Sequence, residues 1–159
     1  MIDRALYRSR QFFTSLRPRV DASLRGEAYA LLPEPQRRLF ESMTPRDQQH
    51  CLDVYRRLRD EHDDRDLLIA ALLHDAGKGR IALWHRVAYV ALDATSPALL
   101  RRVATPGSGL HRCLHHAELG AALAREAGAS ERTAALIAED AASAPEPALR
   151  ALRAADDAA

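Results

Sequence analysis

The sequence has little of what marks a membrane-spanning or secreted protein. Its longest apolar run, residues 67–73, is far too short to cross a bilayer. The opening string MIDRALYRSRQFF lacks the apolar stretch and cleavage site of a signal peptide. Only two cysteines are present, Cys51 and Cys113, and they form no CxxC pair. Free thiols are usual in a reducing compartment, so we expect a cytoplasmic protein without a membrane span.

Residues that favour β-strands are also scarce. Ala, Leu, Arg and Glu dominate the 159 residues, and all four are good helix formers. The hydrophobic share of 47% and the charged share of 28% are typical of a globular chain that buries a core. We predict an all-α fold with helices near 3–16, 21–31, 34–42, 45–60, 64–76, 80–93, 97–104, 111–127, 131–142 and 146–157.

The chain divides into an N-terminal helical extension, residues 1–43, and a main domain, residues 44–159. Thr44 and Pro45 supply an N-cap and a proline at the first helical position, which predicts a helix start at the boundary. Gly77 follows an apolar helix and suits a left-handed C-terminal cap. Trp84 is expected in the core, and His85 is expected in a structural contact.

The net charge of +1 gives no global field that indicates nucleic acid or a membrane as partner. One local exception is residues 1–20, which contain five arginines against a single acid, Asp3. Apolar residues can share one face of a helix there: Ile2, Leu6, Phe13 and Leu16. We expect this helix to dock on its own domain, although a basic amphipathic helix can also bind a membrane or a partner.

Lysine is almost absent. Of the 23 basic residues, one is Lys, at position 78, and the others are Arg. Codon bias in a GC-rich genome explains an excess of Arg but not the one Lys that remains. Because Lys is a compact point charge with a tunable pKa, its position next to other candidate functional residues is informative.

Two histidines are spaced to meet across a helical hairpin. His50 and His74 lie equally far from the turn predicted near His62, about 18 Å along each antiparallel helix. Apolar residues at i−3, i−4 and i−7 place His74 on the core side of its helix. Asp75 follows at the helix end. The spacing predicts a His/Asp cluster inside the bundle.

Counting residues from the turn in the same way predicts a second helical hairpin. His116 and the pair Glu139-Asp140 lie about equally far from the turn predicted at residues 128–129, so they should face each other. The last helix ends with Asp156 and Asp157, a carboxylate pair in an otherwise apolar stretch.

These residues resemble a known signature. His50, the string LIAALLHDAGKG with His74 and Asp75, and Asp156 in LRAADD resemble the H…HD…D pattern of the HD superfamily. The resemblance covers about residues 44–159. It implies an all-helical HD-domain bundle in which His50, His74, Asp75 and Asp156 bind a divalent metal, and it matches Lys78 to the Lys that follows the HD dipeptide in many members.

Part of that superfamily, including HD-GYP phosphodiesterases, holds two or more metals. His116 in HHAELG resembles an additional ligand of that subset, but positions 139 and 140, where a His pair is usual, are Glu139 and Asp140. Carboxylates can bind Mn, Mg or Fe, and they can equally form a solvated helix face, so a second metal stays open. The identity of the first metal, Mn, Mg, Fe, Co, Ni or Zn, also stays open.

The function implied is hydrolysis of a phosphomonoester or phosphodiester, such as a nucleotide, by metal-activated water. Asp75 would hold the metal and orient the water, while Lys78 and His116 would bind the phosphoryl group. The alternatives are a non-catalytic HD module that binds a nucleotide or a partner, and a diiron oxygenase of the HD type. The sequence gives no indication of the oligomeric state.

Overall fold

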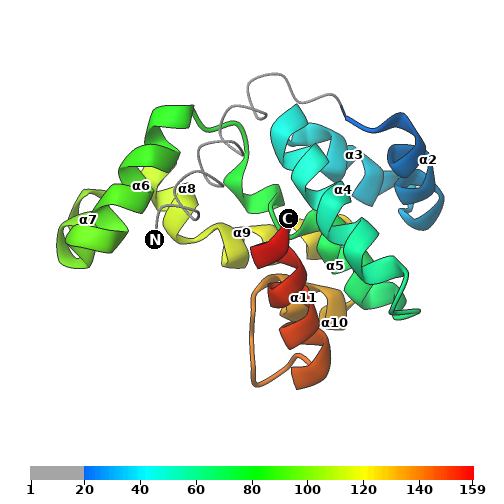
Figure 1. Ribbon diagram of the computed structural model, residues 1–159. Coiled ribbons are helices and arrows are strands. Elements are labelled where there is room, and N and C mark those ends of the chain that lie inside the picture. The colour runs from blue at the N-terminus through cyan, green and yellow to red at the C-terminus, as the bar shows by residue number, and fades with distance from the viewer. Residues whose placement is uncertain (1–19) are drawn as a thin grey trace, which may run out of the picture.

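A computed structural model of the chain describes residues 20–159, with the side chain of Leu83 left aside. In this part of the chain the prediction of an all-α fold is confirmed, because every regular element is a helix (Figure 1). The predicted helix 3–16 lies outside the described residues. The elements are α2 (Ala22–Leu31), α3 (Glu34–Ser42), α4 (Pro45–Arg59), α5 (Arg65–Leu73), the 3-10 helix η1 (Ala76–Lys78), α6 (Leu83–Thr95), α7 (Pro97–Val103), α8 (Gly109–Leu114), α9 (His116–Glu126), α10 (Glu131–Ile137) and α11 (Glu146–Ala158).

Helix starts follow local capping chemistry. The side chain of Thr44 accepts a hydrogen bond from the backbone N–H of Asp47, and Asp64 and Ser130 cap α5 and α10 in the same way. Each cap satisfies an N–H that the first helical turn leaves unpaired. The starts of these three helices therefore lie within one residue of the predicted positions.

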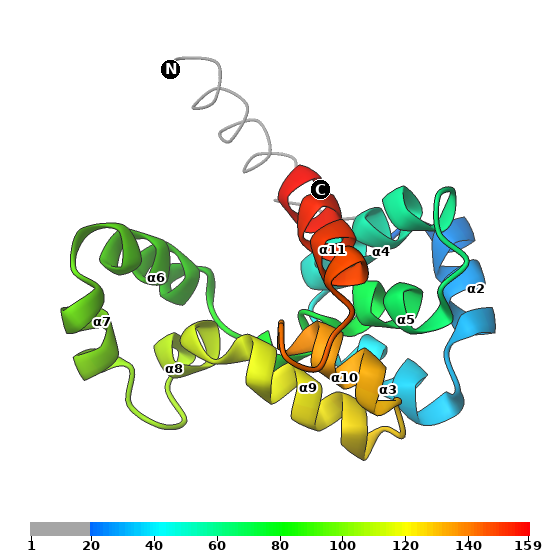
Figure 2. The ribbon, with the colours of Figure 1, turned by 90° about the horizontal axis from the view of Figure 1, so that it is seen from below.

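The core forms around the α4–α5 hairpin, with α2 and α3 on one side and α9, α10 and α11 on the other (Figure 2). The α5 sequence RDLLIAALL is apolar nearly all round, and its residues from Leu67 to Leu73, apart from the partly covered Leu68, are buried. A helix apolar on all sides must be covered on all sides, which places α5 at the centre. Helices before residue 44 join the same core, through Leu24 and Phe40 among others.

Helices α6, α7 and α8, with their connecting loops, project from this body (Figures 1 and 2). We call residues 79–115 the arm. Its anchor is Arg86, whose guanidinium donates two hydrogen bonds, 2.8 and 2.7 Å long, to the buried carboxylate of Asp47 on α4. The prediction that Trp84 lies in the core is wrong, since its side chain is exposed on α6. Helix α6 packs mainly on α7 and α8.

Two predicted helices are shorter than expected. The predicted helix 111–127 is interrupted at His115, where φ is −115° and ψ is 23°, and becomes α8 and α9. These two pieces have different partners, because α8 packs on α6 of the arm while α9 packs on η1 of the body. The predicted helix 131–142 ends at Ile137, and Glu139 adopts a left-handed conformation with φ of 54°.

Gly77 has a different role from the predicted helix cap. It lies in η1 and touches α9 so closely that a Cβ atom would lie 2.0 Å from the carbonyl oxygen of His116 and 2.5 Å from the backbone nitrogen of Gly120. Glycine is therefore required because of backbone contact rather than a left-handed turn. This contact fixes the HDAGK segment beside His116.

No helix in residues 20–159 combines the length and the apolar character that crossing a membrane requires.

Candidate metal centre

His74 occupies the C-cap of α5, where its ring leaves the apolar core. Its Nδ1 lies 3.0 Å from the carbonyl oxygen of Ala71, one turn earlier. A carbonyl only accepts, so Nδ1 carries a proton and the neutral ring keeps its lone pair on Nε2. The ring of His50 on α4 lies 5.3 Å away between centroids, as the hairpin spacing predicts. Two imidazoles thus meet at the end of α5.

The last helix brings a carboxylate to these rings. Oδ1 of Asp156 on α11 lies 2.7 Å from Nε2 of His50 and 3.4 Å from Nε2 of His74. Ligand atoms of the three residues all lie within 4.8 Å of one another, so this group can hold a metal ion. His50 and Asp156 are 106 residues apart in the chain, so only the fold brings them together.

Asp75, the fourth expected ligand, stands beside this group rather than within it. Its Oδ1 lies 3.5 Å from Nε2 of His74. Both of these atoms are buried, Oδ1 beside Nζ of Lys78 and Nε2 near Asp156. A nitrogen lone pair and a carboxylate oxygen that face each other in a buried site repel, and a cation between them would bind both. Imidazole nitrogens and carboxylate oxygens are also a suitable donor set for divalent transition metals, so the residues present fit a metal.

Electrostatics favour a positive charge at Nε2 of His74. Burial lowers the pKa of His74, but its interactions with Cys51, Asp75 and Asp156 outweigh burial and raise the pKa well above its ordinary value. Burial also raises the pKa of the Cys51 thiol, which lies 3.7 Å from Nδ1 of His74. A proton or a metal ion can supply the positive charge that this position favours.

The two carboxylates are held in their ionised form. Burial raises the pKa of Asp75, but the charges of His74 and Lys78 lower it well below its ordinary value. Burial likewise raises the pKa of Asp156, and hydrogen bonds with His50 and His74 lower it well below its ordinary value. Both groups are therefore acceptors and potential anionic ligands at neutral pH.

Lys78 binds the same carboxylate. Its Nζ lies 2.6 Å from Oδ1 and 2.7 Å from Oδ2 of Asp75, three residues earlier. Burial lowers the pKa of Lys78, but this ion pair outweighs burial and raises it, so the ammonium group stays charged. The structure thus places the one lysine at the site, where it holds Asp75 in position.

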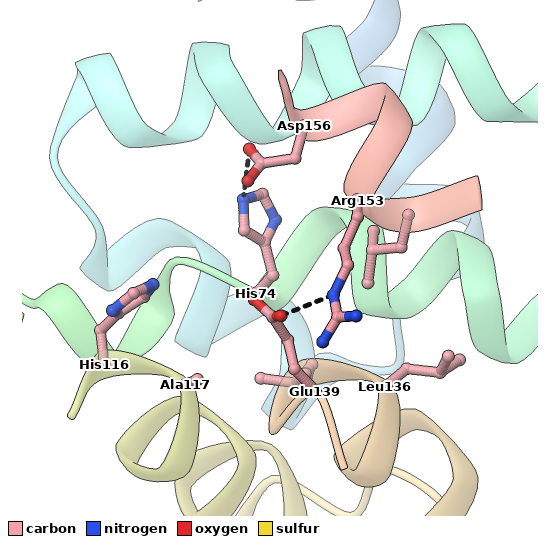
Figure 3. A pocket seen from close by; sticks show the side chains of 9 residues that line it. His74, His116, Ala117, Leu136, Glu139, Arg153 and Asp156 are labelled. Carbon is pink, nitrogen blue, oxygen red and sulfur yellow. Dashed lines mark hydrogen bonds and ion pairs between the residues drawn. The ribbon is translucent and has the colours of Figure 1, made fainter. Parts of the chain in front are cut away.

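A small pocket, open to solvent, adjoins the cluster (Figure 3). His74 and Asp156 line one part of it, and His116 lines another. Nδ1 of His116 lies 2.9 Å from a backbone carbonyl, that of Cys113, which leaves Nε2 of the neutral ring free to accept a hydrogen bond or bind a metal. His116 therefore shares the cavity of the proposed ligands without belonging to the three-residue group.

The two carboxylates at 139–140 follow the end of α10 at Ile137 and lie in different surroundings. Glu139 lines the pocket, but its Oε2 accepts a hydrogen bond of 2.7 Å from Arg153 (Figure 3). Asp140 is exposed and outside the pocket lining, and its Oδ1 accepts from the backbone N–H of Ala142 in a local turn. The expectation that His116 faces both carboxylates therefore holds for Glu139 and is wrong for Asp140.

Arg153 is the pocket residue that the sequence analysis missed. It lies three residues before Asp156 on α11, and the two side chains line the same pocket. The spacing of three residues was the available signal, because residues i and i+3 share a helix face. Arg153 adds a permanent positive charge close to the His/Asp group.

Comparisons of the chain with models of protein families, with curated proteins and with solved structures found no match. No relative therefore assigns a role to His50, His74 or Asp156.

Proposed function

We propose that this chain is a cytoplasmic, metal-dependent phosphohydrolase of the HD type. One observation supports this most strongly: His50 and Asp156, from opposite ends of the main domain, meet at the His74-Asp75 dipeptide. The resemblance implied this grouping, and the buried Nε2 of His74 and Oδ1 of Asp75, 3.5 Å apart, give it a chemical reason.

In this proposal a divalent metal is held by His50, His74 and Asp156, with Asp75 as the fourth ligand. The metal supplies a Lewis acid for a phosphoryl oxygen and makes a water molecule more acidic. Asp75 accepts a hydrogen bond from that water and orients it, since its carboxylate is ionised and fixed by Lys78.

Lys78 and His116 bind the phosphoryl group of the substrate. The ammonium group of Lys78 has three N–H donors. Asp75 accepts from this group, and a remaining N–H can donate to a phosphoryl oxygen. His116 lines the pocket beside the cluster from α9. Charge on the transferring group is stabilised best by donors that are already in place, and the Lys78–Asp75 ion pair holds one such donor.

Arg153 gives the pocket a preference for anionic substrates. A planar guanidinium can bind a phosphate through two parallel hydrogen bonds, and Glu139 keeps Arg153 at the pocket wall until substrate arrives. The substrate class that follows is a small phosphomonoester or phosphodiester, such as a nucleotide.

The first test combines metal analysis with turnover. Protein purified without chelator is expected to contain a divalent metal and to hydrolyse p-nitrophenyl phosphate or bis-p-nitrophenyl phosphate. Metal without turnover of either compound would favour a non-catalytic binding module. Two irons per chain with oxygen consumption would favour an oxygenase, and absence of metal would refute the proposal.

A second test addresses Arg153 against a matched residue on the same helix. Arg153→Ala should raise KM about 10–100-fold while metal content stays constant, because a charged hydrogen bond to substrate is lost. Arg150→Ala is the control, since Arg150 is one turn earlier, is exposed and pairs with Glu146. Equal kinetics for both variants would remove Arg153 from substrate binding.

A further inference from the structure

The exposed side of α6 is apolar, the reverse of an ordinary surface helix. Trp84, Val87 and Val90 are spaced three residues apart and are 62%, 56% and 63% exposed. A neighbouring side packs on α8, where the ring of His85, stacked on Trp84 with centroids 3.6 Å apart, lies against Gly109 so closely that a Cβ atom at Gly109 would be 2.4 Å from it. Helix α6 is therefore fixed with its apolar stripe facing outward.

Helix α7 extends this surface with Leu99 and Val103, which are also exposed. In the described part of the chain these five side chains are the large apolar groups that stand exposed, and all five lie on α6 and α7. We call them the apolar face. A cluster of exposed apolar residues on one element indicates an interaction surface.

Positive charge collects on the same arm. Residues 79–115 contain five arginines and one acid, Asp93. Arg86 is paired with Asp47, whereas Arg80, Arg101, Arg102 and Arg112 are exposed and form no ion pair with any described residue. Residues 21–78 and 116–159 carry 13 basic and 20 acidic residues, a net charge of −7. The overall charge of +1 thus conceals a basic arm on an acidic body.

We propose that the arm docks on the surface of an anionic lipid bilayer. Tryptophan and valine can enter the region between headgroups and acyl chains, and arginines beside them can bind anionic headgroups. The acidic body would be repelled by the same surface, which orients the arm towards the lipid. Residues 1–20 carry the same chemistry in sequence, five arginines with interspersed apolar residues, and stable peripheral binding needs more than one such signal.

Charge distinguishes this partner from two others. A second copy docked symmetrically through the apolar face would bring two basic arms together, which is unfavourable. A nucleic acid would bind the arginines but would leave the apolar face exposed. The inference does not depend on the metal site, because the residues that carry it lie outside the pocket.

The chain provides its own probe, since Trp84 is its one tryptophan. The full chain is titrated with phosphatidylcholine vesicles that contain about 30% phosphatidylglycerol, and with pure phosphatidylcholine vesicles. The anionic vesicles should shift the Trp84 emission to shorter wavelength and shield it from acrylamide, and they should carry the protein in a flotation assay. Pure phosphatidylcholine should bind much more weakly.

Matched variants separate the two contributions. Arg101→Gln with Arg102→Gln should weaken binding to anionic vesicles about 30-fold, at roughly five-fold for each arginine. Arg38→Gln with Arg150→Gln removes the same charge from the exposed body and should leave binding nearly unchanged. Val87→Ser with Val90→Ser should weaken binding roughly ten-fold or more without a change of charge, with helicity checked by circular dichroism.

Four results would overturn the proposal. The first is a Trp84 emission that anionic vesicles do not change. The second is a Trp84 emission that is already blue-shifted and shielded from acrylamide without lipid, because the apolar face would then be covered by another part of the protein. Shielding that depends on protein concentration would indicate a second copy, and shielding that does not would indicate residues 1–19. The third is a shift caused by a DNA duplex or an RNA and not by vesicles. The fourth is equal binding of anionic vesicles by the arm and body arginine variants.

Discussion

Gly77→Ala perturbs the contact that positions the HDAGK segment. The added Cβ would lie 2.0 Å from the carbonyl oxygen of His116, whereas non-bonded heavy atoms rest about 3.5 Å apart. The 3-10 helix η1 and α9 must therefore separate by roughly 1.5 Å. Both clashing partners, this oxygen and the nitrogen of Gly120, belong to the backbone of α9, so no side-chain rotation can relieve the clash.

The expected cost is about 3 kcal/mol in the free energy of unfolding, at the upper end of what overpacking a core causes. Separation of η1 from α9 should also shift Asp75, which directly precedes η1, relative to His50 and Asp156, so metal binding should weaken together with stability. Urea denaturation followed by circular dichroism measures the first effect, and titration with Mn²⁺ measures the second.

Gly26→Ala is the matched control. Gly26 lies inside α2, and a Cβ there would meet no atom within 4 Å. Alanine removes conformational freedom from the unfolded chain and favours the helix, so this variant should be more stable by about 0.5–1 kcal/mol. The change in the free energy of unfolding should thus have opposite signs in the two glycine variants. A Gly77→Ala protein as stable as the parent would refute the close packing of η1 on α9.

Two further predictions concern carboxylates outside the site. Arg86→Ala leaves the buried carboxylate of Asp47 without its two guanidinium hydrogen bonds. The free energy of unfolding, measured by urea denaturation, should fall by about 3–5 kcal/mol. A proteolysis time course should also show earlier cleavage within the arm. Asp66→Asn should cost about 1 kcal/mol at neutral pH, because Asp66 accepts hydrogen bonds from Ser130 and Thr133 that lower its pKa. Because the pKa of Asp66 is lowered in the folded state, its ionised carboxylate stabilises the fold above the unfolded pKa of about 4, and this contribution is lost as the pH falls. The parent and Asp66→Asn proteins should therefore become equally stable in acid. A difference in their free energies of unfolding that stays constant with pH would contradict this.

Local chemistry explains most of what the sequence predicted correctly. Helix starts at Thr44, Asp64 and Ser130 depend on residues within one turn, so their caps were readable. The meeting of His50 and His74 depends on one hairpin between two regular helices, and its geometry follows from residue counts. Both kinds of inference need only short stretches of chain.

The errors have tertiary causes. The break at His115 separates a helix that packs on the arm from one that packs on the body, and no local sequence signal marks that change of partner. Trp84 is exposed because α6 has neighbours on one side, which its composition does not reveal. The role of Gly77 depends on the approach of α9, about 40 residues later in the chain. The pairing of Arg153 with Glu139 likewise joins separate elements.

The central claim, that Asp156 completes a metal site with His50 and His74, is tested most directly by a pair of adjacent substitutions. Asp156→Asn and Asp157→Asn each remove one carboxylate charge from the last turn of α11, but Asp157 is exposed and lies outside the group that can hold a metal. Mn²⁺ affinity is measured for both by isothermal titration calorimetry. The account predicts a loss of at least about 100-fold for Asp156→Asn and no change for Asp157→Asn. Equal affinities for the two variants would contradict it.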